Sequence, residues 1–313
     1  MESNKQGPPP TPSRFWRVLR LMPLTFMLLS LGILLVMFLM GGMTKISAWY
    51  LLQSIPPLLG LLSLVTVLVY AIAKRKFNQL MVSTLILALV SLLPAVMLVK
   101  PVAFPTSLET TQPSATVRLP ADVPLIVGWG GDRIETNYHA IAPDQRWAYD
   151  LLVEPAAMGS GRLEDYGCYG VPVVAPANGV VVKAHDGEPD ATPGVVSNNF
   201  TAPEGNFVAI RLEETGTYLL IAHLKPGSVT VQTGETVREG QVIGACGNSG
   251  NTSEPHIHIH HQRQDPNFYP LNFAEGLPLY FRDHDGPPMP VGGFKVDGET
   301  VILTGDVVQH TGK

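Results

Sequence analysis

The stretch GNSGNTSEPHIHIHHQ, residues 247–262, decides how the second half of the chain is expected to fold. Its first six residues are Gly, Asn, Ser and Thr, which favour turns. After them His256, His258 and His260 alternate with isoleucines, a period of two that is typical of a β-strand. The pattern predicts a strand with imidazoles on one face, and two imidazoles about 7 Å apart on such a face can serve one metal site.

Two residues far from this stretch carry the same kind of chemistry. His223 closes the apolar run 218–222, and Asp150 stands inside another apolar run, WAYDLLV, residues 147–153. A carboxylate is costly to bury unless it is paired or bound to a cation. That cost favours a metal-ligand role for Asp150.

The sequence around these residues predicts a compact all-β domain over 123–275. Short runs rich in Val, Ile, Leu and Tyr are separated by Gly, Pro, Asn and Asp. No helical period of comparable strength appears among them. The expected strands are 171–175, 179–184, 207–212, 217–222, 228–231 and 241–245.

Two segments flank the predicted domain. Residues 101–122 are rich in Pro and Thr and are expected to form a linker. Residues 276–313 are expected to form a C-terminal extension. In it, the apolar runs 294–296 and 300–304 lie on either side of Asp-Gly at 297–298, a pattern typical of a β-hairpin.

Residues 1–100 predict a membrane anchor. Three stretches without charged residues, 21–44, 46–73 and 77–99, each reach the ~20 residues that a helix needs to cross a bilayer. A cleaved signal peptide could account for one such stretch but not for three. Because no charged residue lies inside them, they lack the usual sign of an ion or proton path, which weakens the interpretation as a transporter.

Basic residues orient the predicted anchor. Arg14, Arg17 and Arg20 precede the first stretch and three basic residues at 74–76 separate the second from the third, whereas the other side has only Lys45 and Lys100. The positive-inside rule then places the N-terminus in the cytoplasm and the β domain outside. We therefore expect a multi-pass protein of the cell membrane.

Charge is divided unevenly between the two halves. Residues 1–100 hold nine of the 21 Lys and Arg residues but one of the 26 Asp and Glu residues, so residues 101–313 are strongly acidic. Nucleic acids need a basic surface, so we expect no nucleic-acid partner. The two cysteines, Cys168 and Cys246, both stand in the acidic half, where an oxidising compartment would allow a disulfide; two separate buried thiols remain the alternative.

Several motifs in a fixed order resemble the lysostaphin-type zinc endopeptidases, which cut peptides of the bacterial cell wall. They are GVPVVAPANGV at 170–180, AHL at 222–224, GQVIG at 240–244, and GNSG at 247–250 leading to PHIH at 255–258. The resemblance covers about residues 137–262. It implies a β-sandwich with an active-site groove and one zinc ion held by His, Asp and the second His of His-x-His. Residues 154–169 would be an insertion, which we expect to wall the groove.

Carried over to this chain, the resemblance makes Asp150 and His258 zinc ligands, and His223 and His256 catalytic histidines that do not bind the metal. The family pattern has a further His four residues before the Asp, where this chain has Arg146. An arginine stays protonated and cannot bind zinc. We therefore expect His139 to supply the first ligand from a loop. The alternatives are a site that uses His260, or a domain without activity.

The function that these observations predict is a zinc-dependent endopeptidase. It would hydrolyse peptide bonds in peptidoglycan cross-links, or in another extracytoplasmic peptide, with a zinc-activated water assisted by two histidines. One histidine would transfer the proton and the other would stabilise the oxyanion, in an order that the sequence leaves open. The alternative is an inactive lysostaphin-like module that binds or regulates another cell-wall hydrolase.

Overall fold

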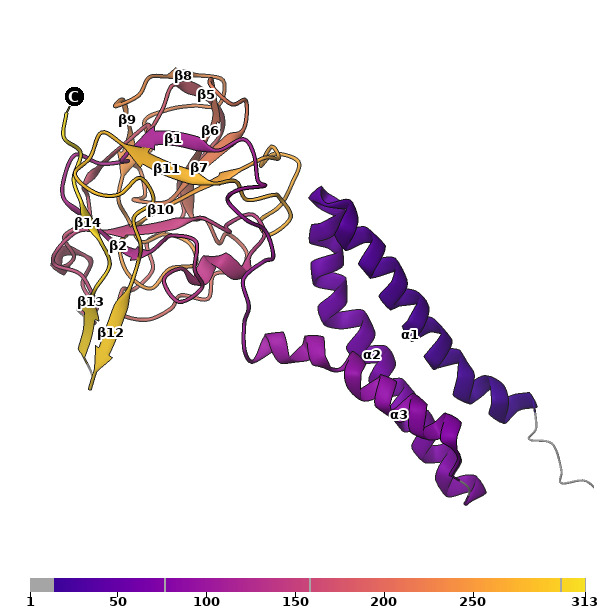
Figure 1. The fold of residues 1–313 in the computed structure, drawn as a ribbon. Helices are drawn as coiled ribbons and strands as arrows, with labels where there is room; N and C mark the ends of the chain where they lie inside the picture. Colours follow the sequence, from indigo (N-terminus) through magenta and orange to yellow (C-terminus); the bar gives the residue numbers. More distant parts are fainter. Residues whose placement is uncertain (1–13, 76, 158, 299, 313) are drawn as a thin grey trace, which may run out of the picture. The chain divides into compact units, whose positions relative to one another are not determined.

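The computed structural model describes residues 14–75, 77–157, 159–298 and 300–312. They form two compact units, residues 1–101 and 102–313. Residues 1–13 and Lys76, which belong to the predicted anchor and its cytoplasmic side, lie outside the described residues. Each unit is considered by itself below (Figure 1).

The first unit is helical. Its elements are α1 (Arg14–Met40), α2 (Gly42–Lys74), α3 (Gln79–Ser91) and the 3-10 helix η1 (Leu93–Leu98). Within the described residues, the helical segments Gly42–Lys74 and Gln79–Leu98 are long and apolar enough to cross a membrane, and Leu24–Met40 is a shorter apolar helix. The structure thus shows two candidate spans by length and composition, where the sequence predicts three.

The second unit is built on one eight-stranded sheet in the order β14-β2-β3-β10-β7-β6-β5-β8. All neighbouring strands in this sheet are antiparallel. The strands are β2 (Leu125–Trp129), β3 (Tyr149–Leu152), β5 (Gly179–His185), β6 (Asn206–Leu212), β7 (Tyr218–Leu224), β8 (Thr236–Val237), β10 (Ile257–Gln262) and β14 (Val307–Val308). The two strands that carry Asp150 and His258 are neighbours at the centre of the sheet.

Three two-stranded sheets complete this unit. They pair β1 (Ala115–Arg118) with β11 (Leu279–Arg282), β4 (Pro172–Val174) with β9 (Val242–Ala245), and β12 (Phe294–Asp297) with β13 (Thr300–Leu303). One continuous apolar core includes residues of β1, β11, β4 and β9 together with one face of the large sheet. The unit is therefore β-rich, with two 3-10 turns, η2 (Tyr138–Ile141) and η3 (Leu163–Asp165).

Most of the expected strands are present, with two differences. Residues 228–231 are not a strand. The Thr230 amide donates to the Ile243 carbonyl, but the Ala245 amide donates to the Ser228 hydroxyl, so the backbone hydrogen bonds of a strand pair do not continue. The segment 101–122, expected as a linker, contains β1, whose residues pair with β11. The hairpin of β12 and β13 forms around residues 297–298 as the sequence predicts.

Cys168 and Cys246 form a disulfide, with Cα atoms 5.8 Å apart. The bridge joins the 154–169 segment to the residue directly before the turn at 247–252. Both cysteines are buried in the core. The alternative of two separate thiols does not apply to this structure.

Candidate metal centre

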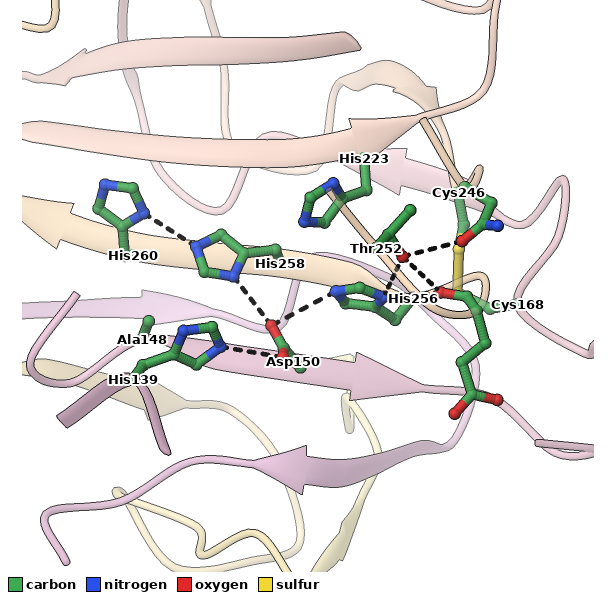
Figure 2. Close-up of polar contacts among 12 residues, drawn as sticks. His139, Ala148, Asp150, Cys168, His223, Cys246, Thr252, His256, His258 and His260 are labelled. Atoms are coloured by element: carbon green, nitrogen blue, oxygen red, sulfur yellow. Dashed lines mark hydrogen bonds and ion pairs between the residues drawn. A yellow bond between two sulfur atoms is a disulfide. The ribbon is translucent and has the colours of Figure 1, made fainter. Parts of the chain in front are cut away.

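Strand pairing brings Asp150 and His258 together. The register of β3 against β10 places the two residues directly opposite each other, although 108 positions separate them in the chain. The Nδ1 atom of His258 lies 2.8 Å from Oδ1 of Asp150. Figure 2 shows both side chains on the same side of the sheet.

His139 reaches the same carboxylate from a turn. It lies in η2, where the Asn137 side chain accepts a hydrogen bond from its backbone amide. Asn137 is fully buried and also donates to the carbonyls of Gly131 and Ala148, so the turn is held against β3. His139 Nε2 lies 2.9 Å from Oδ2 of Asp150 (Figure 2).

These three side chains form the group best suited to a metal ion among the described residues. One nitrogen or oxygen atom from each of His139, Asp150 and His258 lies within 4.8 Å of the others. All three side chains are buried. Two imidazoles and a carboxylate are a donor set that zinc accepts, and three protein ligands leave room for a further one, as in catalytic zinc sites.

The charge balance of the group also fits a cation. Burial raises the pKa of Asp150, but the imidazoles of His139 and His256 outweigh it and hold that pKa well below its ordinary value. Asp150 is therefore a buried carboxylate anion. Such an anion needs positive charge or several donors close to it.

Arg146 does not approach this group. Its Nε donates to the carbonyl of Phe104, and a second guanidinium nitrogen forms an ion pair with Asp132 at 3.0 Å. The side chain is buried, so it serves as a cross-link between loops rather than as a substitute ligand. The side chain that approaches Asp150 is that of His139, eleven residues before it in the chain.

His223 and His256 lie beside the group without belonging to it. Their ring centroids are 4.7 Å apart, and the His223 ring is 5.7 Å from that of His258. His256 Nε2 lies 3.5 Å from Asp150 Oδ1. All five histidine and aspartate side chains that the sequence singled out therefore meet at one place (Figure 2).

Residues 164–270 match the model of peptidase family M23. The chain contains an M23 peptidase domain. The match includes His223, His256 and His258, whereas His139 and Asp150 precede it. No match was found among the curated proteins.

Solved structures similar to this chain include three bacterial peptidases. A zinc-containing peptidase from Vibrio cholerae is 16% identical over 47% of this chain and 36% of its own, with a TM-score of 0.31. Lysostaphin from Staphylococcus simulans is 20% identical over 46% and 48%, with a TM-score of 0.30. A mutant catalytic domain of the prophage-encoded M23 protein EnpA from Enterococcus faecalis is 15% identical over 49% and 88%, with a TM-score of 0.30. The chain thus spans less than half the length of the first two.

Backbone carbonyls orient the two outer histidines of the M23 domain. His223 Nδ1 lies 2.8 Å from the carbonyl of Ser249, and His256 Nδ1 lies 2.8 Å from that of Glu254. A carbonyl oxygen only accepts, so each Nδ1 carries a proton. The other nitrogen, Nε2, is turned away from these carbonyls, and in His256 it lies 3.5 Å from Asp150 Oδ1. Ser249 lies in the turn at 247–252 that follows Cys246, and Glu254 lies two residues beyond it.

His223 also has an unusual backbone. Its φ is +61°, a region that residues other than glycine seldom adopt, and it lies where the register of β6 against β7 shifts. The His223 amide donates to the carbonyl of Glu204, and the Gly247 amide donates to the His223 carbonyl. Two loops therefore hold this conformation, which turns the imidazole toward His256 and His258.

Protonation differs between the two outer histidines. Burial, with the nearby rings of His256 and His258, holds the pKa of His223 well below its ordinary value. Burial lowers the pKa of His256 as well, but the Asp150 carboxylate outweighs it and raises that pKa. The two imidazoles thus have unlike proton affinities.

His260 takes no place among the ligand atoms, contrary to the alternative that the sequence left open. It contacts the other side of His258, with its Nδ1 3.0 Å from His258 Nε2. Burial, together with His258, lowers the pKa of His260 to about 3, so its ring is neutral. His261 points away and contacts the Thr217 hydroxyl and the Pro278 carbonyl.

A cleft of about 690 Å³ opens over His139, His223 and His258. Residues of 200–204 and 266–272 form its walls, together with Tyr138 and Lys183. None of the described residues of 154–169 lines it, so the expectation that this insertion walls the groove was wrong. The disulfide and a bond from the Ala157 amide to the Glu254 carboxylate hold that segment elsewhere.

The cleft walls contain residues that the sequence did not indicate. Tyr138 is 46% exposed beside His139. Glu204 also lines the cleft, and its backbone carbonyl accepts a hydrogen bond from the His223 amide. Lys183 comes from β5, on the far side of β6 and β7. Only the proximity of Tyr138 to His139 in the sequence could have indicated one of them.

Proposed function

We propose that this chain is a zinc-dependent endopeptidase that hydrolyses peptide bonds in peptidoglycan cross-links. The observation that carries the proposal is the convergence of His139, Asp150 and His258 within 4.8 Å, inside a chain that contains an M23 peptidase domain. Their nitrogen and oxygen atoms would hold one zinc ion. The floor of the cleft is the only place among the described residues where such a group is found.

Each residue has a distinct task in this proposal. When bound, zinc polarises a peptide carbonyl and makes a water nucleophilic at neutral pH. His223 and His256 offer Nε2 atoms on the same side, where one accepts the water proton and returns it to the leaving amine. The other donates a hydrogen bond to the developing oxyanion. Asp150, whose two oxygens lie 2.9 Å and 2.8 Å from ring nitrogens of His139 and His258, would supply the negatively charged ligand between them.

The substrate would lie along the cleft as an extended peptide. An opening of about 690 Å³ exceeds what one side chain needs and can take several residues of a chain. Its walls carry both a carboxylate, Glu204, and an ammonium group, Lys183, so they suit a zwitterionic peptide better than a polyanion. Short cell-wall peptides, with free amino and carboxyl groups, have this chemistry.

We also propose that the helical unit inserts in the membrane, with the N-terminus in the cytoplasm and the M23 domain outside. Two helices meet the length and hydropathy of a span, and the third apolar stretch adds the crossing that the basic residues favour. The disulfide supports an oxidising surrounding for the M23 domain. The anchor would restrict the enzyme to wall peptides near the membrane surface.

The test uses the full chain purified in detergent. We expect one zinc per chain by elemental analysis, and hydrolysis of purified peptidoglycan that a chelator abolishes and added zinc restores. His258→Ala should lose both the metal and the activity. The matched control is His185→Ala. His185 is an exposed histidine that pairs with Glu188 outside the site, so this variant should keep both the metal and the activity.

Two outcomes would contradict the proposal in different ways. A chain that holds zinc but releases no peptide from peptidoglycan would favour the inactive module that binds or regulates another hydrolase. A chain that hydrolyses peptidoglycan equally well after complete removal of metal would exclude the zinc mechanism.

A further inference from the structure

His139, Asp150 and His258 are called the metal group below. A row of side-chain hydrogen bonds runs along one face of β10 and begins at His258 of this group. His258 Nε2 lies 3.0 Å from His260 Nδ1, and His260 Nε2 lies 3.0 Å from Gln262 Oε1. Gln262 Nε2 in turn donates to the backbone carbonyl of Gln264 at 2.6 Å. The row therefore joins a predicted metal ligand to a main-chain oxygen, and Figure 2 shows its first bond.

The carbonyl of Gln264 gives the row a direction. A carbonyl oxygen only accepts, so the amide nitrogen of Gln262 must face it and the amide oxygen must face His260. That oxygen also only accepts, so His260 Nε2 carries a proton. The partners of the ring are His258 and Gln262, and without a carboxylate among them a buried imidazolium would be costly, so the ring is neutral. His260 Nδ1 is then a lone-pair acceptor, and His258 must donate to it from Nε2.

The opposite direction would bring two oxygens together. If the Gln262 amide were turned over, its oxygen would face the Gln264 carbonyl at hydrogen-bonding distance with no proton between them. The three side chains of the row are buried: His258, His260 and Gln262 are 5%, 1% and 4% exposed. A buried polar atom without a partner is costly, which disfavours the opposite direction.

The consequence reaches the metal group. With its proton on Nε2, the neutral His258 ring has its lone pair on Nδ1, which lies 2.8 Å from Oδ1 of Asp150. Two acceptors this close repel each other unless a cation lies between them, so Nδ1 is the atom that a metal ion would bind. We propose that His260 is a positioning residue that fixes His258 in the tautomer and orientation that bind zinc. This inference rests on the proposed function.

His261 shows that a buried histidine in this strand need not have such a role. It is as buried as His260, and both its nitrogens have partners, but those are Thr217 and Pro278, away from the metal group. It is therefore the matched control. A change at His261 also removes a buried ring with two hydrogen-bonded nitrogens, but leaves the contacts of His258 in place.

The test compares three variants of the full chain in detergent. His260→Phe keeps an aromatic ring but offers no acceptor to His258 Nε2, whereas His260→Asn places an amide oxygen close to the position of Nδ1. His261→Phe is the control. Zinc affinity is measured by competition with a chromophoric chelator, and thermal unfolding of the metal-free chains reports stability.

We expect His260→Phe to weaken zinc binding by ~10–100-fold, the range found when a partner of a metal-binding histidine is lost. His260→Asn should restore most of that loss, and His261→Phe should bind zinc like the unchanged protein even where its unfolding temperature falls. With saturating zinc, His260→Phe should recover hydrolysis, with KM for the peptide unchanged.

Equal zinc affinities for His260→Phe and His260→Asn, in an unchanged protein that binds zinc, would overturn this inference and leave the proposed function standing. A loss of affinity that follows the unfolding temperature across all three variants would also overturn it, because it would show a general structural effect. An unchanged protein that binds no zinc would overturn both.

Discussion

The two faces of β10 differ although the same residue types supply both. The even-numbered positions, with His256 directly before the strand and then His258 and His260, face the metal group and the cleft. The odd-numbered positions Ile257 and Ile259 lie in the apolar core. One strand thus carries chemistry on one side and packing on the other.

The difference shows what makes a histidine functional in this fold. His260 and His261 are adjacent and equally buried, but only His260 contacts a residue of the metal group. The alternation of the strand decides between them, because successive side chains point to opposite faces. The predictions below test whether the two faces are as separate as the structure indicates.

The largest effect is expected at Asp150, which contacts His256 and His258 of the even face and also His139. Asp150→Ala should reduce the zinc content from one per chain to near zero and bring hydrolysis down to that of the chelated protein. Removing the carboxylate leaves the imidazoles of His139 and His256 without the charge that attracts a cation. Elemental analysis and peptide release measure both quantities; stoichiometric zinc in the variant would separate Asp150 from the metal site.

His139 is expected to have almost the same effect from outside the strand. His139→Ala should lose zinc and activity, because the turn of η2 supplies one of the three ligand atoms. Arg146→Ala is the control, since Arg146 fills the family position of that ligand but contacts Phe104 and Asp132. If the arginine variant lost zinc at normal stability and the histidine variant did not, the first-ligand assignment would be wrong.

His223 should separate chemistry from metal binding. His223→Ala is expected to keep one zinc per chain and to lose ~10²–10⁴ in kcat, the usual contribution of a general acid–base group. The reason is that His223 lies beside the ligand group without offering it an atom. Parallel zinc and rate measurements decide the matter, and a variant without zinc would make His223 part of the metal site.

On the odd face, Ile259 should affect stability alone. Ile259→Ala removes a fully buried side chain from the core and should cost about 2–5 kcal/mol of unfolding free energy. Zinc affinity of the folded protein should stay within about threefold, because the ligands lie on the other face. Denaturant unfolding and zinc competition test this; a large loss of affinity in the folded variant would show that the two faces are coupled.

A feature of the structure could be predicted where neighbouring residues in the sequence determine it. The alternation of His256, His258 and His260 is local, so the strand and its polar face could be predicted. Asp150 was indicated by the cost of a carboxylate in an apolar run. The pairing of Asp150 opposite His258 depends on the register of strands 108 residues apart, which no local pattern encodes.

Other features had weaker signals or none. β1 lies in a Pro- and Thr-rich segment, and its pairing with β11 depends on residues more than 160 positions away. The run 228–231 has the composition of a strand, but the hydroxyls of Thr230 and Ser228 bond to the backbone of 242–245 where backbone groups of a paired strand would do so. The cleft walls come from irregular loops, whose course depends on tertiary contacts rather than on periodicity.

The smallest effect is expected at Asp144, a buried carboxyl group with one oxygen that has no hydrogen-bond partner. Every histidine on the even face has a partner, whereas Asp144, 1% exposed, accepts from the Asn272 amide with one oxygen and has no partner for Oδ1. Burial raises the pKa of Asp144 to about 6 from 3.8. Because the folded state binds this proton more tightly, its stabilising effect is complete below pH 3.8 and is lost as pH rises through about 6.

Asp144→Asn should remove this pH dependence, because an amide keeps the acceptor for Asn272 and does not ionise. The variant should gain stability relative to the unchanged protein between pH 4.5 and 7.5, by on the order of 2–3 kcal/mol. Unfolding temperatures of the two metal-free chains, compared at each pH, measure the gain while the titration of shared groups cancels. A difference that stays constant over this range would mean that Asp144 ionises with the same pKa in the folded and the unfolded chain, and that burial does not raise its pKa.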